Sequence, residues 1–338
     1  MGKTEEVMIY FFLGIQCLLI LFIALHDWVN IPPLTNLSAL KKTTHLNYIL
    51  AFPFIGCAMG NGACKKILKN LIAILLLFPL LAFGQSPFDY DLHLFSIPGT
   101  SQRVMICFHG YGDNYEIAVS LKNLKGIEAT LVSFNFPEYD IKQGRKYDYT
   151  KATFGTFDEL LPALYVMKQV VLDQGRDSID LYGFSAGGGA LINVIGVLNT
   201  SIYDDKLKEV GIGTLEKEKL LTAIQRGLVI LDTPLKSIEE IINFRGSTDE
   251  LECLAKNYRD NHLRPIDSLR RLRGLSLDIL LHFQGKDEIL SNRDDDLYIE
   301  RLKATQSKIE IIIEDDGGHM SPHLSLWRLY FKKMYDYY

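Results

Sequence analysis

Cysteine is scarce in this sequence, and no two cysteines have the spacing of metal ligands. Three of the five lie in the first 84 residues, which leaves only Cys107 and Cys253 in the remainder. Cys107 lies in an apolar run typical of a buried strand, so we interpret it as a thiol of the core. A disulfide between Cys107 and Cys253 stays open, although no feature of the sequence favours it.

Excess positive charge and internal repeats are also absent. The 338 residues carry a formal net charge of −5, and residues 1–84 hold six lysines and three acidic residues, which leaves 30 basic and 38 acidic residues in 85–338. A mildly acidic remainder argues against nucleic acid as the main partner. Hydrophobic residues make up 48% of the chain and charged residues 23%, which is typical of a globular protein and gives no sign of disorder.

Two apolar segments early in the sequence indicate contact with a membrane. The 19 residues of 7–25 contain one clearly polar side chain, and at about 1.5 Å per residue they are long enough to span a bilayer. Trp28 follows where an interfacial anchor is expected. The segment 48–59 is shorter and is broken by Pro53 and Gly56, so we expect a partial span, or a re-entrant or interfacial segment.

A third apolar segment, 71–83, has the layout of a secretory signal peptide. Lysines precede it in 65–69, and the small residues Ala82 and Gly84 stand at the positions that a signal-peptide cleavage site requires. Because a signal peptide should open a chain, two interpretations remain. Either translation starts later in the sequence, for example at Met59, or the whole chain is made and the apolar segments 7–25 and 71–83 anchor it in the membrane.

The lysines that precede the last apolar segment favour the cytoplasmic side of a membrane. We therefore divide the chain into a membrane-anchor or signal-like region, 1–84, and a globular domain, 85–338. This domain is expected on the extracytoplasmic side, either anchored to the membrane or secreted.

From Phe88 onward, short apolar runs alternate with longer helical patterns. The strand candidates are 91–97, 103–108, 129–134, 178–182, 227–231, 277–283 and 308–313, and the helix candidates are 157–173, 187–199, 296–305 and 324–335. Near-continuous apolar strands that alternate with helices predict an α/β fold, with a mostly parallel sheet covered on both faces. A ligand is then expected at the carboxyl ends of the strands.

Two charged stretches, 204–219 and 237–273, interrupt this alternation and are expected to be helical. They form either a modest cap over the site or plain solvated surface. A small cap would favour compact substrates over long-chain lipids.

The sequence Gly183-Phe184-Ser185-Ala186-Gly187 joins a strand candidate to a helix candidate and fits the Gly-x-Ser-x-Gly pattern of a nucleophile elbow. In that motif a serine lies at a strained turn, and the glycines let the backbone pass close to neighbouring elements. The turn lifts the hydroxyl above the sheet, and it directs the free N–H groups of the helix N-terminus at developing negative charge.

Three more groups of polar and glycine residues follow predicted strands. His109-Gly110-Tyr111-Gly112 follows the second strand, Gly285-Lys286-Asp287 the sixth, and Gly317-Gly318-His319 the seventh. Together with the serine motif, which comes after the first of these groups, they place Ser, Asp and His in this order at the ends of successive strands. In this the chain resembles the α/β-hydrolase superfamily over residues 88–338. The first 84 residues are not covered by this resemblance.

The resemblance implies a serine hydrolase of the carboxylesterase type, acting on a small-molecule or acyl ester with no metal or organic cofactor. Ser185 would attack the carbonyl carbon, and His319 would take the serine proton. Asp287 would accept the other imidazole N–H and stabilise the imidazolium. The backbone N–H groups of Tyr111 and Ala186 would form the oxyanion hole.

Other residues compete for two of these roles. His323 lies close to His319 in the chain, but the Gly-Gly-His context after a strand favours His319. Glu288 adjoins Asp287, and Asp232 ends an earlier strand, where some members of the superfamily carry the acid. The Gly-x-Asp turn after an apolar strand favours Asp287, and Asp232 stays open as the alternative.

Three further features have simpler explanations than chemistry. We interpret His109 as a residue that shapes its turn, and His282, inside a strand, as a packed core residue. The run Asp294–Asp296 could suggest calcium, but carboxylates that open a helix are more simply explained as capping groups.

The same site permits other functions. Peptide or thioester cleavage needs the same groups, because a fold does not determine a substrate. A non-catalytic binding module with a hydrolase fold also stays open. So does a membrane scaffold in which 1–84 is the functional part.

Overall fold

The structure, a computed structural model, describes residues 92, 94–123, 127–137, 149–291, 295–320 and 323–335. The predicted segments 7–25, 48–59 and 71–83 and the boundary after residue 84 lie outside these ranges. They stay predictions, and so does the extracytoplasmic placement that was inferred from them. Within the described ranges, no helix combines the length and the apolar character needed to cross a bilayer.

In the described part of the chain, seven strands pair into one sheet in the order β1-β3-β2-β4-β5-β6-β7. They are β1 (Phe95–Ile97), β2 (Val104–Phe108), β3 (Thr130–Ser133), β4 (Asp180–Phe184), β5 (Leu228–Asp232), β6 (Asp278–Gln284) and β7 (Lys308–Glu314). Only β1 pairs antiparallel, with β3, and every other pairing is parallel. The carboxyl ends of six strands therefore lie at one edge of the sheet.

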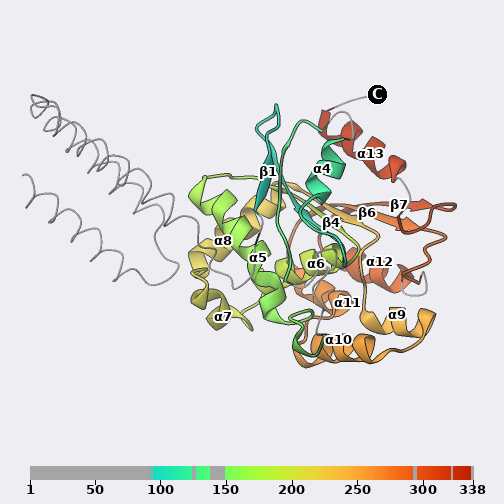
Figure 1. Cartoon of the computed structure of the whole chain (residues 1–338). Helices are drawn as coiled ribbons and strands as arrows, with labels where there is room; N and C mark the ends of the chain where they lie inside the picture. Colours follow the sequence, from blue (N-terminus) through green and yellow to red (C-terminus); the bar gives the residue numbers. More distant parts are fainter. Residues whose placement is uncertain are drawn as a thin grey trace, which may run out of the picture. The chain divides into compact units, whose positions relative to one another are not determined.

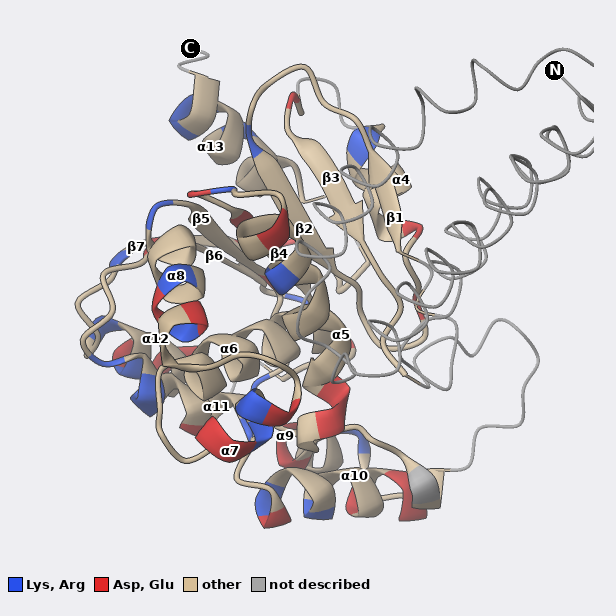
Figure 2. Ribbon diagram, turned by 90° about the vertical axis from the view of Figure 1, so that its left-hand side faces the viewer, with Lys and Arg blue, Asp and Glu red and all other residues tan. Residues whose placement is uncertain are grey.

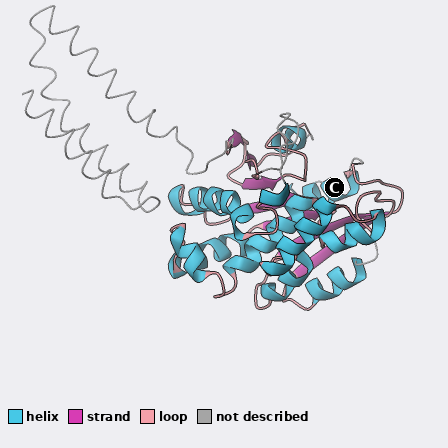
Figure 3. Ribbon diagram, turned by 60° about the horizontal axis from the view of Figure 1, so that its bottom comes forward, coloured by secondary structure: helices cyan, strands magenta, loops and turns pink. Residues whose placement is uncertain are grey.

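Helices cover both faces of this sheet (Figures 1 and 3). They are α4 (Ile117–Lys122), α5 (Phe157–Lys168), α6 (Ala186–Leu198), α7 (Asp204–Glu209), α8 (Thr214–Gln225), α9 (Ile238–Arg245), α10 (Asp249–Asp260), α11 (Pro265–Ser268), α12 (Asp295–Lys303) and α13 (Leu324–Tyr335). Short 3-10 turns, Tyr149–Lys151 and Leu269–Leu272, and a π-helical turn, Gln169–Asp173, complete the regular structure described.

Consecutive residues of the central strands point to opposite faces of the sheet and so build two cores. The larger core includes residues of α5, α6 and α8, and from the strands it takes Ile106, Phe108, Leu181, Val229, Leu231, Ile279 and Leu281. The smaller core includes residues of α4 and α13, and it takes Met105, Cys107, Tyr182, Leu228, Ile230 and Leu280. Burial on both faces explains why these strands are continuous apolar runs in the sequence.

The predicted elements match the observed ones closely. All seven strand candidates are strands, and the candidate 324–335 coincides with α13. The candidate 157–173 is one α-helix, α5, that continues into the π-helical turn. Both charged stretches are helical as expected, and Figure 2 shows acidic and basic residues concentrated on α7, α8 and α10. Cys107 and Cys253 are both free thiols, so the disulfide left open by the sequence does not form.

The core can be tested at one isoleucine of β5. The Ile230 side chain is fully buried, so Ile230→Ala is expected to lower the free energy of unfolding by about 2–5 kcal/mol, measured by urea denaturation. Ile202→Ala is the matched control, because 71% of Ile202 is exposed and its loss should cost no more than about 0.5 kcal/mol. Similar losses in the two variants would contradict this packing.

Candidate active site

Ser185 lies in the sharp connection between β4 and α6, with φ +52° and ψ −120°. A positive φ is unfavourable for a residue with a Cβ, and such strain costs about 1–3 kcal/mol. The surrounding hydrogen bonds hold the residue there. The backbone N–H of Ser185 donates to the carbonyl of Asp232 at 3.0 Å, and its carbonyl accepts from the backbone N–H of Leu235 at 2.8 Å.

The glycines of the motif are required by close packing. A Cβ on Gly183 would lie 2.7 Å from the Cα of Gly188. A Cβ on Gly187 would press against the carbonyl oxygens of Phe108 and His109, closer than side chains tolerate. The elbow therefore packs against its own helix and against the end of β2, and this is the local structure that the Gly-x-Ser-x-Gly pattern predicts.

A line of hydrogen bonds joins the three side chains that the sequence singled out. His319 Nε2 lies 2.9 Å from Ser185 Oγ, and His319 Nδ1 lies 2.7 Å from Asp287 Oδ2. Ser185 follows β4, Asp287 follows β6 and His319 follows β7, so parallel pairing brings three distant segments to one edge. With Nδ1–H donated to the carboxylate, Nε2 of His319 is free to accept the serine proton.

The Asp287 carboxylate is fixed from a second side. Its Oδ1 accepts the backbone N–H groups of Ile289 at 2.8 Å and Leu290 at 2.7 Å. Burial acts to raise the pKa of Asp287, but the hydrogen bond with His319 and these two N–H groups outweigh it, so the pKa lies below its ordinary value. Asp287 is therefore ionised at neutral pH.

Glu288 has a structural role that the sequence does not reveal. Its Oε2 accepts the backbone N–H of His319 at 3.0 Å. A Cβ on the preceding residue, Gly318, would lie 2.6 Å from the same oxygen, so a larger residue there would require the Glu288 carboxylate to move. The rival acid thus holds the backbone of the histidine, while Asp287 holds its ring.

The turn after β2 packs beside the serine. A Cβ on Gly110 would lie 3.4 Å from the Cβ of Ser185, which shows how close the two segments are. His109 Nε2 accepts the backbone N–H of Phe136 at 3.1 Å, in agreement with its interpretation as a residue that shapes the turn. The Tyr111 hydroxyl donates to Glu250 Oε1 of α10 at 2.6 Å. The charged stretch 237–273 therefore reaches this edge of the site, as a small cap would.

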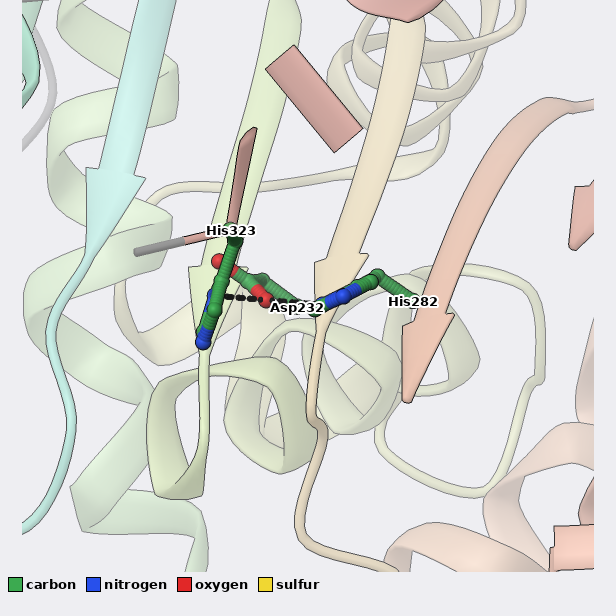
Figure 4. Close-up of side chains that lie close together, drawn as sticks. All are labelled: Asp232, His282 and His323. Atoms are coloured by element: carbon green, nitrogen blue, oxygen red, sulfur yellow. Dashed lines mark hydrogen bonds and ion pairs between the residues drawn. The ribbon is translucent and has the colours of Figure 1, made fainter. Parts of the chain in front are cut away.

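Asp232 belongs to a second, separate cluster (Figure 4). Its Oδ1 lies 2.8 Å from His282 Nδ1 and 2.6 Å from His323 Nδ1, and its Oδ2 accepts the hydroxyl of Tyr182 at 2.8 Å. Burial acts to raise the pKa of Asp232, but hydrogen bonds from His282 and His323 lower it to about 2. The acid left open as an alternative partner of His319 binds two other histidines instead.

This cluster is also the group among the described residues whose side chains could hold a metal ion. Each residue offers one ligand atom, and these atoms lie within 4.8 Å of one another. Both Nδ1 atoms lie at hydrogen-bond distance from the same carboxylate oxygen, which is the geometry of two imidazoles bound to one carboxylate. The calcium alternative at Asp294–Asp296 falls partly outside the described residues, and Asp295 forms an ion pair with Lys236.

Comparison with solved structures identifies the fold. The carboxylesterase Cest-2923 from Lactobacillus plantarum is 14% identical, and the superposition covers 71% of this chain and 86% of that chain with a TM-score of 0.50. The chain has the α/β-hydrolase fold. A lipase/esterase from Lactobacillus plantarum is also similar, at 14% identity, with 72% and 99% of the two chains covered and a TM-score of 0.48.

Acetyl xylan esterase 1 from a Thermoanaerobacterium species is 16% identical, with 72% of this chain and 79% of that chain covered and a TM-score of 0.46. No protein-family model matches the sequence, and a search of curated proteins finds no match either. The observed sheet and the similarity to Cest-2923 confirm the fold class predicted from the strand pattern and the four strand-end motifs, while the roles of individual residues rest on their geometry.

The packing of this α/β-hydrolase elbow can be tested on one helix. Gly187→Ala is expected to lower the free energy of unfolding by about 1–3 kcal/mol, because the new Cβ overlaps two carbonyl oxygens. Gly196→Ala, also in α6, is the matched control. The nearest atom to its new Cβ is 3.4 Å away, so stability should hold or rise by up to about 1 kcal/mol. Equal effects in a denaturant titration would count against the close approach at Gly187.

Proposed function

We propose that this chain is a serine hydrolase that cleaves a small-molecule carboxylic ester through an acyl-enzyme. The observation that carries the proposal is the hydrogen-bonded line from Asp287 through His319 to Ser185 at the carboxyl edge of the sheet. A serine hydroxyl is a weak nucleophile at neutral pH, and a histidine placed to take its proton is what activates it.

In the acylation step, Ser185 Oγ attacks the ester carbonyl carbon while its proton moves to His319 Nε2. The C–O bond to the alcohol then breaks, and the leaving oxygen takes that proton. In the second step a water molecule gives a proton to His319 and attacks the acyl-serine. The carboxylic acid leaves, and the proton returns to Ser185. In both steps the ionised Asp287 stabilises the imidazolium.

We assign the oxyanion hole to the backbone N–H groups of Ala186 and Tyr111. Ala186 is the first residue of α6, and the first N–H groups of a helix have no partner within it. The turn that carries Tyr111 packs against the serine through Gly110. Each such donor contributes on the order of 3 kcal/mol to stabilisation of the transition state. No metal or organic cofactor takes part in the proposed reaction.

Labelling with a fluorophosphonate tests the nucleophile without requiring the natural substrate. The purified full chain should form one adduct per chain on Ser185, located by mass spectrometry, because such probes react only with an activated serine. Ser185→Ala and His319→Ala should each abolish both labelling and ester turnover in a folded protein.

Ser178→Ala is the matched control. Ser178 lies just before the amino end of β4, away from Ser185, and its hydroxyl donates to the carbonyl of Arg226. Absence of an adduct on folded wild-type protein would favour the non-catalytic binding module. Faster turnover of a peptide or thioester than of an ester by the same serine would change the substrate class and keep the mechanism.

The acid can be tested by one isosteric change. Asp287→Asn should lower kcat by about 10³- to 10⁴-fold, because the amide no longer stabilises the imidazolium or selects the tautomer. The control is Asp316→Asn, in the exposed loop after β7, where Asp316 pairs only with Lys286. Near wild-type kcat in Asp287→Asn would transfer the role of the acid to another residue.

A further inference from the structure

Three neighbouring strands and one loop converge on the carboxylate of Asp232. Asp232 is the last residue of β5, and its partner in the parallel register is His282 of β6. Tyr182 of β4 donates to the other carboxylate oxygen. His323, directly before α13, completes the group (Figure 4). Only 1% of Asp232 and none of His282 is exposed, so this carboxylate depends on protein donors alone.

Asp232 also contacts the proposed nucleophile. Its carbonyl accepts the backbone N–H of Ser185 at 3.0 Å, while its carboxylate holds His323. One residue therefore binds both the strained turn of the serine and His323.

His323 is connected to His319 by more than the chain. The ring of Phe184, the residue before Ser185, lies 5.1 Å from the His319 ring and 5.9 Å from the His323 ring, measured between centroids. His323 also packs against His282, with ring centroids 4.6 Å apart. A displacement of His323 would be passed to the His319 ring through Phe184.

His319 and His323 are thus each held by carboxylates. Glu288 accepts the backbone N–H of His319, and Asp287 accepts its ring N–H. Asp232 binds His323, whose carbonyl accepts the backbone N–H of Trp327 in the first turn of α13. Glu288 and Asp287 therefore hold His319, and a third carboxylate, Asp232, holds His323.

We infer that Asp232, with His282 and His323, is a positioning group that sets the distance between Ser185 and His319. It acts through His323 and Phe184, and it touches no substrate. The inference rests on the proposed hydrolase function, because its consequence for rate requires Ser185 and His319 to react. A catalytic group displaced by about 1 Å loses roughly 100-fold in rate, so a carboxylate that is not part of the triad can control kcat.

The protonation state of His323 affects how strongly Asp232 binds it. The ionisable groups that face His323 are Tyr182, Asp232, His282, Glu314 and His319. Burial acts to lower the pKa of His323, but the hydrogen bond and the charge of Asp232, with the charge of Glu314, raise it above the ordinary value. The stabilisation that the Asp232–His323 pair gives to the folded chain is fully present below the ordinary histidine pKa of about 6.5. It is lost as pH rises through the raised pKa of His323.

Asp232→Asn in the full chain tests the inference. The rate of fluorophosphonate labelling and kcat for an ester should fall about 10- to 100-fold, with KM changed less than about twofold. Asp180→Asn is the matched control. Asp180 is equally buried, at 1% exposed, and is paired with Arg103 at 2.9 Å, but it lies at the opposite end of β4. It should lose stability and keep the wild-type rate per folded molecule.

A pH profile separates positioning from a general loss of stability. The rate of the wild-type chain should decline on the alkaline side as His323 loses its proton. In His323→Gln this decline should vanish, because the side chain no longer titrates, and Asp180→Asn should keep it. A wild-type rate and profile in Asp232→Asn would overturn the inference.

One measurement separates failure of this inference from failure of the proposed function. The His319 Nδ1 proton shared with Asp287 should give a downfield proton resonance by NMR, whether or not the chain has hydrolase activity. If the wild type is not labelled, a shift or loss of this resonance in Asp232→Asn but not in Asp180→Asn still supports positioning. An unchanged resonance contradicts it. A stoichiometric transition metal bound to the wild type and absent from Asp232→Asn would also overturn it.

Discussion

Parallel pairing of the strands is the constraint on which the rest of this structure depends. Because β2, β4, β5, β6 and β7 all run in one direction, the residues that follow them meet at a single edge of the sheet. Side chains as distant in sequence as Ser185 and His319 then lie 2.9 Å apart without any local motif that contains both. The two cores, one on each face, keep the strands in register, so the geometry of the site depends on packing far from it.

At that edge the protein stores strain and offsets it locally. Ser185 has a backbone conformation that is unfavourable for a residue with a side chain. Its N–H group is bonded to Asp232, the last residue of β5, and its C=O group to Leu235, which follows β5. Gly183 and Gly187 remove the two Cβ atoms that would prevent this approach. Hydrogen bonds and close packing therefore fix the backbone of the elbow, and the Ser185 hydroxyl lies 2.9 Å from His319 Nε2.

The carboxylates of Asp287 and Asp232 bind the histidines at this edge of the sheet. Asp287 accepts two backbone N–H groups and one imidazole, and Asp232 accepts two imidazoles and a tyrosine hydroxyl. The pKa of each is below its ordinary value because hydrogen bonds to the charged form outweigh burial. Asp287 binds His319, and Asp232 binds His282 and His323, so one carboxylate can serve the proposed chemistry while the other holds His323.

The sequence by itself determined the alternation of strands and helices, the elbow at Ser185, and the set of polar residues at strand ends. These follow from apolar periodicity and from glycines that a tight turn requires, and both are local properties. Only the tertiary structure decided that His319 pairs with Asp287, that Asp232 binds His282 and His323, and that Glu288 holds the backbone of His319. The Gly-x-Asp turn favoured Asp287 over Asp232, but local sequence left Asp232 open as the partner of His319. Which histidine it meets depends on strand order and loop path, which arise from packing between residues far apart in the chain.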